Sequence, residues 1–242
     1  MKVDTINYSV SGLSCQGQLV YEESRTQRPL LLMAPNWLGI VPPATEVARM
    51  LAGDRYIVFV ADMYGEGNKP TGKENPMEFL APLTKDAAET RRRVVAAFDT
   101  MLRETEKRDL GDRRKRAAIG YCFGGANVLD LARAGADVAA VVSMHGSLAT
   151  PMPAKKGDVK AAVLVVHGAA DPIAPKAERD ALEAELDAAG ARWAMLNWGG
   201  VVHAFTDPHA NRPGAAAYHE PTTRHGYTLA HAFIADAFAG KL

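Results

Sequence analysis

The sequence predicts an α/β fold, in which a mostly parallel central sheet is led by an antiparallel N-terminal hairpin and has helices on both faces. Two observations predict it. Apolar strand-like runs alternate along the chain with segments of helical spacing, and most of these runs are too continuously apolar to face water. The first residues instead alternate between polar and apolar with a period of two, as the strands of a hairpin do.

The expected strands begin with the hairpin, whose arms are residues 2–10 and 15–23 around a turn at 11–14. Further strands are expected at 30–34, 56–62, 116–120, 138–144, 161–168 and 191–198. Helices are expected at 43–53, 84–106, 124–135, 174–190 and 227–240, which place a helical segment between most of the strands.

Two stretches, 62–83 and 199–220, interrupt this pattern with irregular sequence, and each follows the end of an expected strand. In an open α/β sheet the ligand crevice lies outside the carboxyl ends of the strands. We therefore expect both stretches to wall a site. Two ordinary surface loops are the alternative.

The composition is that of one domain spanning residues 1–242, since a chain of 242 residues with 48% hydrophobic content can bury a full core. The 28 Lys and Arg residues balance the 28 Asp and Glu residues, so no long-range field favours nucleic acid or an acidic membrane surface. The basic runs 91–93 and 113–116 are interleaved with acidic residues, and we interpret both as solvated helix surface.

The N-terminus lacks the charged and apolar regions of a signal peptide, and no apolar run reaches the roughly 18 residues that span a bilayer. The two cysteines, Cys15 and Cys122, lie far apart in the sequence, which is typical neither of a disulfide framework nor of a metal site. We expect a cytoplasmic protein that contacts no membrane, with Cys15 as a small packed residue.

Cys122 lies at the centre of the segment Gly-Tyr-Cys-Phe-Gly-Gly, directly after an expected strand and before an expected helix. This is the pattern of a nucleophile elbow, a turn so tight that glycine is needed on both sides of the nucleophile. The backbone N–H of Phe123 and the positive end of the helix would favour a thiolate and supply one oxyanion donor. The alternative is a buried cysteine at a packed helix start.

An elbow of this kind requires an acid after a later strand and a histidine after a still later one. Asp171 follows the expected strand 161–168, and His203 lies in the stretch after the last expected strand. An imidazole can take the thiol proton and return it to a leaving group, while a carboxylate holds its tautomer. The chain order therefore predicts Cys122, His203 and Asp171 as a catalytic triad.

The motifs "GYCFGG", "HGAADP" and "HAF", in this order, resemble those of the dienelactone hydrolase family, whose α/β-hydrolase fold carries a cysteine nucleophile. The resemblance covers essentially the whole chain. It implies that Cys122 is the nucleophile, His203 the base and Asp171 the orienting acid, and that the backbone N–H of Trp37 is the second oxyanion donor.

Two residues depart from the pattern of that family. Asn36 stands where dienelactone hydrolases carry a glutamate that holds the resting thiol, and an amide cannot accept its proton. Asp207 stands where family members that cleave dienelactone use an arginine to grip the substrate carboxylate, which an aspartate would repel. The resemblance thus implies a hydrolase of a neutral ester or lactone rather than one specific for dienelactone.

Several other side chains adjoin the expected catalytic elements. Aromatic residues at these places would form an apolar substrate pocket, with core packing as the alternative for Phe205. His145 ends an expected strand at the edge of the site, as His167 does, although a histidine bonded within the loops is the more common arrangement. The substrate-binding candidates are Asn36, Trp37, Tyr64, Phe123, His145, Phe205 and Asp207.

The remaining histidines show no metal-ligand spacing, so we expect no metal and no cofactor. The prediction is a cysteine hydrolase that cleaves a small-molecule ester or lactone through a thioacyl intermediate, as a monomer or homodimer. The alternative is a non-catalytic ligand receptor or a thiol redox sensor on the same fold, because an exposed reactive thiol is also easily oxidised.

Overall fold

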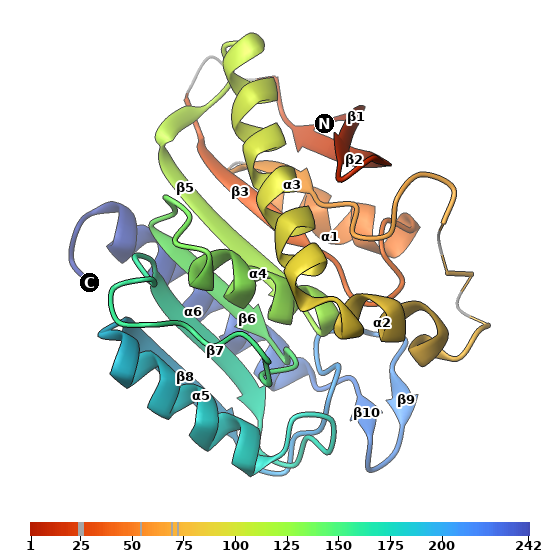
Figure 1. Ribbon diagram of the computed structural model, residues 1–242, viewed down its shortest axis with the longest axis vertical. Coiled ribbons are helices and arrows are strands. Elements are labelled where there is room, and N and C mark those ends of the chain that lie inside the picture. The colour runs from red at the N-terminus through yellow and green to blue at the C-terminus, as the bar shows by residue number, and fades with distance from the viewer. Residues whose placement is uncertain (24–26, 54, 69, 72) are drawn as a thin grey trace. The chain divides into compact units, whose positions relative to one another are not determined.

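The computed structural model describes residues 1–23, 27–53, 55–68, 70–71 and 73–242. Their contacts divide the chain into two compact units, Met1–Ala118 and Ile119–Leu242. Within these described residues, eight strands form a mostly parallel sheet that is led by an antiparallel hairpin and accompanied by six helices, which confirms the predicted fold class (Figure 1).

The first unit begins with the hairpin of β1 (Lys2–Val10) and β2 (Leu13–Tyr21). Its turn has two central residues, Ser11 and Gly12, both with positive φ, so it is tighter than the expected turn at 11–14. β2 pairs antiparallel with β4 (Ile57–Val60), and β4 pairs parallel with β3 (Pro29–Ala34). Every residue of β4 is buried, as continuously apolar strands predict.

The described part of the first unit contains the helices α1 (Pro42–Ala52), α2 (Pro76–Lys85) and α3 (Ala87–Lys107). The expectation that 62–83 is irregular throughout is wrong, because α2 begins inside it. The Asn75 side chain caps α2 by accepting the Met77 N–H, and Pro76 supplies a φ suited to the first turn. Lys69 and Gly72 of this stretch lie outside the described residues.

β5 (Asp112–Tyr121) carries the chain from the first unit into the second. It begins four residues before the expected strand and includes the basic run 113–116, whose interpretation as helix surface is therefore wrong. The side chains of Arg113, Arg114 and Lys115 are exposed, and Arg114 pairs with Asp112 at 3.1 Å. An exposed strand end has no apolar pattern from which a sequence could identify it.

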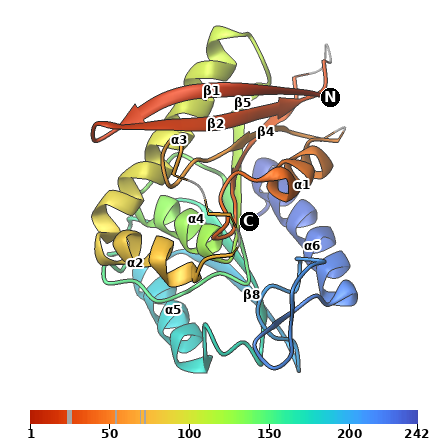
Figure 2. The same cartoon turned by 90° about the vertical axis from the view of Figure 1, so that its right-hand side faces the viewer.

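In the second unit β6 (Ala140–Met144), β7 (Ala162–Gly168) and β8 (Arg192–Trp198) run parallel to one another. β6 and β7 are wholly buried, while β8 alternates between partly buried and exposed residues. α4 (Phe123–Arg133) and α6 (Glu220–Phe238) pack on opposite faces of β6 (Figure 2). α5 (Lys176–Ala189) joins β7 to β8 and ends at Gly190 in the left-handed conformation.

The second irregular stretch, 199–220, contains the short strands β9 (Asn211–Arg212) and β10 (Ala216–Ala217), which pair antiparallel. α6 begins seven residues before the expected helix at 227, because His219 caps it by accepting the Thr222 N–H and Pro221 lies in its first turn. Across the part of the chain that the structure describes, no helix combines the length and apolar character that crossing a membrane requires.

Candidate functional site

Cys122 occupies the turn between β5 and α4 with strained backbone angles, φ 54° and ψ −117°. Its N–H donates to the carbonyl of Met144 at 3.1 Å, and its own carbonyl accepts the N–H of Gly125 at 2.9 Å. A non-glycine residue adopts such angles only where the surrounding structure imposes them. The half-buried Cys122 side chain thus stands at the N-terminal end of a helix, in the geometry of a nucleophile elbow.

Glycine is required around Cys122 because the backbone passes too close for a side chain. A Cβ at Gly120 would lie 2.0 Å from the carbonyl oxygen of Gly124. A Cβ at Gly125 would lie 2.6 Å from the Cα of Gly146 and 2.7 Å from the Ser143 Oγ, so Gly125 allows α4 to approach the end of β6. The two glycines set how tightly the strand turns into the helix.

His203 and Asp171 come together at the carboxyl ends of the strands of the second unit. The Nδ1 of His203 donates to Asp171 Oδ2 at 2.7 Å, and both side chains are buried. Asp171 Oδ1 accepts the backbone N–H of Ile173 at 2.8 Å, which leaves Oδ2 directed to the imidazole. The His203 N–H and carbonyl are bonded to Ala215 and Ala217, so the segment around β10 fixes its backbone.

The electrostatics of this pair favour an ionised imidazole. Burial lowers the pKa of His203, but its hydrogen bond to Asp171 and the neighbouring Cys122 outweigh burial and raise the pKa to about 10. Burial raises the pKa of Asp171, and the bond from His203 outweighs it, so the carboxyl remains ionised. The His203 Nε2 is buried and makes no hydrogen bond within the described residues, while the Cys122 side chain is close enough to affect the ring.

Two further buried histidines flank this pair. His145 is bonded through Nε2 to the Thr206 hydroxyl at 2.7 Å, and its ring lies edge-to-face with that of His203, 5.1 Å between centroids. The Nε2 of His167 donates to the carbonyl of Ala174 at 3.0 Å and lies 3.7 Å from Asp171 Oδ2. Both rings are bonded within the scaffold, and the role of His145 in binding substrate stays a prediction.

The other candidates in the second unit take different places. Phe205 has no exposed surface and packs edge-to-face on His145, 4.9 Å between centroids. Asp207 is half-buried, and its Oδ1 accepts the backbone N–H of His209 at 2.9 Å. Phe123 is buried as the first residue of α4. Their roles toward substrate stay predictions.

Three candidates, Asn36, Trp37 and Tyr64, belong to the first unit. The Asn36 Oδ1 accepts the Leu38 N–H at 3.0 Å, so its side chain folds back on its own loop. The Tyr64 hydroxyl donates to the carbonyl of Trp37 at 2.6 Å. These contacts tie the loop after β3 to the loop after β4, and the assignment of Trp37 as an oxyanion donor stays a prediction.

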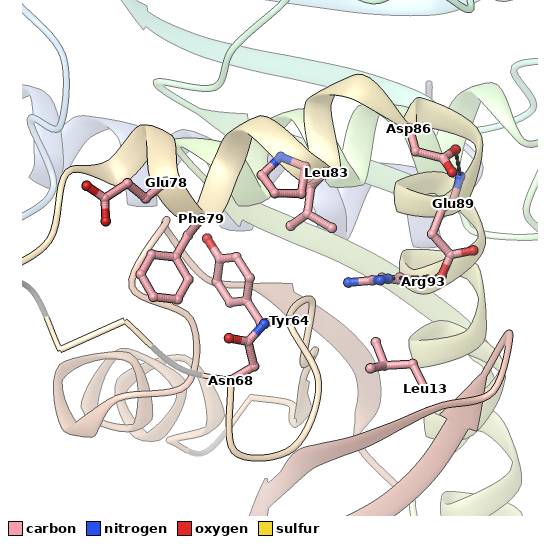
Figure 3. Close-up of a pocket in the computed structure, with 10 residues that line it drawn as sticks. Leu13, Tyr64, Asn68, Glu78, Phe79, Leu83, Asp86, Glu89 and Arg93 are labelled. Carbon is pink, nitrogen blue, oxygen red and sulfur yellow. Dashed lines mark hydrogen bonds and ion pairs between the residues drawn. The ribbon is translucent and has the colours of Figure 1, made fainter.

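Tyr64 also lines a cavity of about 380 Å³ in the first unit, beside β2, α2 and α3 (Figure 3). Its ring lies edge-to-face with Phe79, and Arg93 closes one side, bonded to Glu89 and to the Met63 carbonyl. The residues that line the cavity are Leu13, Tyr64, Asn68, Glu78, Phe79, Pro82, Leu83, Asp86, Glu89 and Arg93.

Thr206 is a residue of the site that the sequence analysis missed. It lies three positions after His203, and its hydroxyl is bonded to the His145 ring, which the sequence places sixty-one residues earlier. Its position next to Phe205 was the one sequence signal for a place in the site. That signal is weak, because a single threonine can form many kinds of local hydrogen bond. Within the described residues no group of three His, Cys, Asp or Glu side chains could hold a metal ion.

The sequence profile of the dienelactone hydrolase family matches residues 16–237. The chain belongs to the dienelactone hydrolase family. This dienelactone hydrolase family member is 32% identical to the solved structure called m3DLH, with 98% of each chain covered and a TM-score of 0.89. It is 31% identical to a dienelactone hydrolase-like promiscuous phosphotriesterase, P91 from metagenomic libraries, with 98% of each chain covered and a TM-score of 0.86.

Among curated proteins, this family member is 23% identical over 207 residues to a Salmonella typhimurium protein named provisionally as a carboxymethylenebutenolidase. That match covers 82% of this chain and 74% of the Salmonella protein. Membership of the dienelactone hydrolase family makes the chain a hydrolase that acts on ester or lactone bonds.

Proposed function

We propose that this hydrolase cleaves carboxylic esters or lactones through a thioacyl intermediate on Cys122, with His203 as general base and Asp171 as its orienting acid. The observation that carries the proposal is the 2.7 Å bond between His203 and Asp171, beside a cysteine held in an elbow with φ 54°. A nucleophile, an imidazole that can take its proton and a carboxylate that orients the imidazole are the groups that acyl transfer uses.

In the first half of the reaction, the Cys122 Sγ attacks the substrate carbonyl carbon, and the thiol proton resides on Nε2 of His203. The C–O bond of the ester then breaks, and Nε2 gives its proton to the departing alkoxide. Asp171 stabilises the imidazolium that exists between these two proton transfers. We assign the backbone N–H groups of Phe123 and Trp37 to the oxyanion of the tetrahedral intermediate.

In the second half, a water molecule takes the place of the alcohol. Nε2 of His203 accepts one proton of this water, and the water oxygen attacks the thioacyl carbon. The S–C bond breaks, the acid leaves, and the imidazolium is again paired with the Cys122 sulfur. Each group returns to its starting protonation state, so no cofactor is consumed.

For the substrate we propose a neutral small-molecule ester or lactone. Asp207 supplies a negative charge at the place where the family resemblance implies an arginine, and a carboxylate there disfavours an anionic substrate. The Asn36 amide cannot accept the thiol proton, whereas a glutamate carboxylate could. We retain the expectation of one cytoplasmic domain that spans residues 1–242, as a monomer or homodimer.

The test is the activity of Cys122→Ala and His203→Ala on p-nitrophenyl acetate, longer p-nitrophenyl esters and an aryl lactone. Because the nucleophile and its base act as one unit, we expect the loss of either residue to lower kcat by about 10⁴-fold or more. A phosphotriester belongs in the panel because a similar structure is that of a promiscuous phosphotriesterase. Near wild-type rates in either variant would contradict the proposal, and a reversible oxidation of Cys122 without any turnover would favour a redox sensor.

A further inference from the structure

His145 directly follows β6 in a strained backbone conformation, with φ 40°. Its N–H donates to the carbonyl of Val166 on β7 at 2.9 Å, which fixes the residue between two buried strands. Asparagine, aspartate and histidine tolerate such angles better than other non-glycine residues, but they remain costly. The fold holds a histidine at this position against its backbone preference.

The His145 ring is held on three sides. It lies edge-to-face with the rings of His203 and Phe205, at centroid distances of 5.1 and 4.9 Å. Its Nε2 is bonded to the Thr206 hydroxyl at 2.7 Å, and Thr206 follows Phe205 in the segment that also carries His203. Its buried Nδ1 makes no hydrogen bond within the described residues. One ring thus joins the end of β6 to the segment that presents His203.

We infer that His145 is a positioning residue for the reaction proposed above: its ring, anchored by Thr206, holds the His203 imidazole in the orientation that presents Nε2 to Cys122. This inference rests on the proposed function. It adds a residue that acts through His203.

The geometry explains why such a residue is needed. Asp171 holds the His203 ring through Nδ1 alone, and a single hydrogen bond leaves the ring able to pivot. Contact with the His145 ring blocks that pivot on one side. Because misplacement of a reacting group by about 1 Å can cost roughly 100-fold in rate, a packed ring at this point has a direct effect on kcat.

The His145 ring must also stay neutral to suit this role. Burial lowers its pKa well below the ordinary histidine value, and the nearby His203 and His167 lower it further. The titratable groups that face it are His203, His167 and Tyr121, whose ring centroid is 6.3 Å away. A neutral ring packs against the His203 imidazolium without the repulsion that a second cation would bring.

The first experiment measures kcat and KM of His145→Asn, which keeps a residue suited to positive φ and an amide that can bond Thr206 but removes the ring. We expect kcat to fall about 10-fold to 100-fold with KM within about twofold of wild type. Thr206→Val, which frees the ring from its anchor, is expected to give a smaller loss. His145→Phe restores the ring and is expected to recover most of the kcat that His145→Asn loses.

His225→Asn is the matched control. His225 also has one ring contact, with Trp198 at 5.3 Å, and one bond from Nδ1 to the Pro221 carbonyl, but it is exposed on α6. We expect its kcat to equal that of wild type. A folded His145→Asn protein whose kcat is also unchanged would overturn the inference.

The second experiment does not depend on turnover. The Nδ1 proton of His203 is observed by NMR in Cys122→Ala, with and without His145→Asn. We expect its downfield resonance to broaden or move when the ring of residue 145 is lost, and an unchanged resonance would contradict the inference. If Cys122→Ala retains activity, the proposed function fails while this readout still tests His145. If Cys122→Ala is inactive and His145→Asn has normal kcat, the inference alone fails.

Discussion

The two cysteines of this chain each have a buried aspartate in their neighbourhood, but only beside Cys122 is that aspartate bonded to an imidazole. Cys15 lies on β2, is 1% exposed and has Asp62 nearby. Burial, and to a smaller extent the charge of Asp62, raise the pKa of Cys15 to about 11. Cys122 is half-buried at the start of α4, and near it Asp171 is bonded to the imidazole of His203.

The difference lies in what each carboxylate contacts. Asp62 accepts the backbone N–H groups of Gln16, Tyr64 and Gly65, so it organises the loop after β4. Asp171 accepts Nδ1–H of His203 and raises the pKa of the ring that faces Cys122. A carboxylate beside a thiol suppresses its ionisation, whereas a carboxylate behind an imidazole supports it. The imidazole makes one cysteine a candidate nucleophile and its absence leaves the other inert.

The largest effect is expected from Asp171→Asn, which removes the carboxylate behind the His203 imidazole but keeps the shape of the side chain. An amide cannot stabilise the imidazolium and can hold His203 in the wrong tautomer, so kcat should fall by about 10⁴-fold. Steady-state kinetics on p-nitrophenyl acetate measure the loss. Asp62→Asn serves as the matched change beside Cys15, and a comparable loss of kcat in a folded Asp62→Asn protein would break the comparison.

A second effect concerns the reactivity of the two thiols. With a pKa of about 11, Cys15 is almost entirely protonated at neutral pH, whereas Cys122 has the His203 imidazole beside it to take its proton. Iodoacetamide should therefore alkylate Cys122 at least ~100-fold faster than Cys15 at pH 7. Peptide mass spectrometry of timed samples resolves the two sites. Equal rates, or faster labelling of Cys15, would contradict the assignment.

A smaller effect is expected from Asn36→Glu, which introduces the glutamate that the family resemblance implies. If this carboxylate reaches the thiol, it should disfavour the thiolate and slow alkylation of Cys122 by about tenfold, as expected for one contact of ~1.4 kcal/mol. The labelling rate of Cys15 in the same protein is the internal control. An unchanged rate at Cys122 would mean that residue 36 does not influence the nucleophile.

The smallest effect is on stability. The bond from His203 lowers the pKa of Asp171 against the opposing effect of burial, so the stabilisation it provides is present above the unfolded value of 3.8 and is lost as the pH falls below it. The difference in free energy of unfolding between wild type and Asp171→Asn should therefore shrink below pH 3.8, by at most ~1.4 kcal/mol per pH unit. Urea titrations of both proteins from neutral to acid pH measure it. A difference that stays constant would show that Asp171 gains nothing from its ionised form.

The parts of the fold that could be predicted from sequence are those with a physical signature in the local pattern. Buried strands such as β6 and β7 are continuous apolar runs, and the elbow at Cys122 is marked by the glycines that its tight turn requires. The helix α2 could not be predicted, because its sequence is rich in proline and few of its side chains are buried. The exposed start of β5 could not be predicted, because its run of charged residues does not alternate between polar and apolar side chains.

The site divides in the same way. Chain order was enough to pair Asp171 with His203, because strand order places their loops at one edge of a parallel sheet. The contact between His145 and Thr206 could not be predicted, since it joins loops sixty-one residues apart through side-chain packing alone. Nor could the sequence show that Phe205 has no exposed surface and packs on His145.

The central claim is that Cys122, and not Cys15, carries the acyl group during turnover. Rapid acid quench after mixing with an excess of a slowly hydrolysed aryl ester, followed by peptide mass spectrometry, tests it directly. The account predicts one acyl group on the peptide that contains Cys122, accumulating before steady state in wild type and absent in Cys122→Ala. Full turnover with no acylated Cys122 peptide at any time, or an acyl group on Cys15 that forms and decays at the catalytic rate, would contradict it.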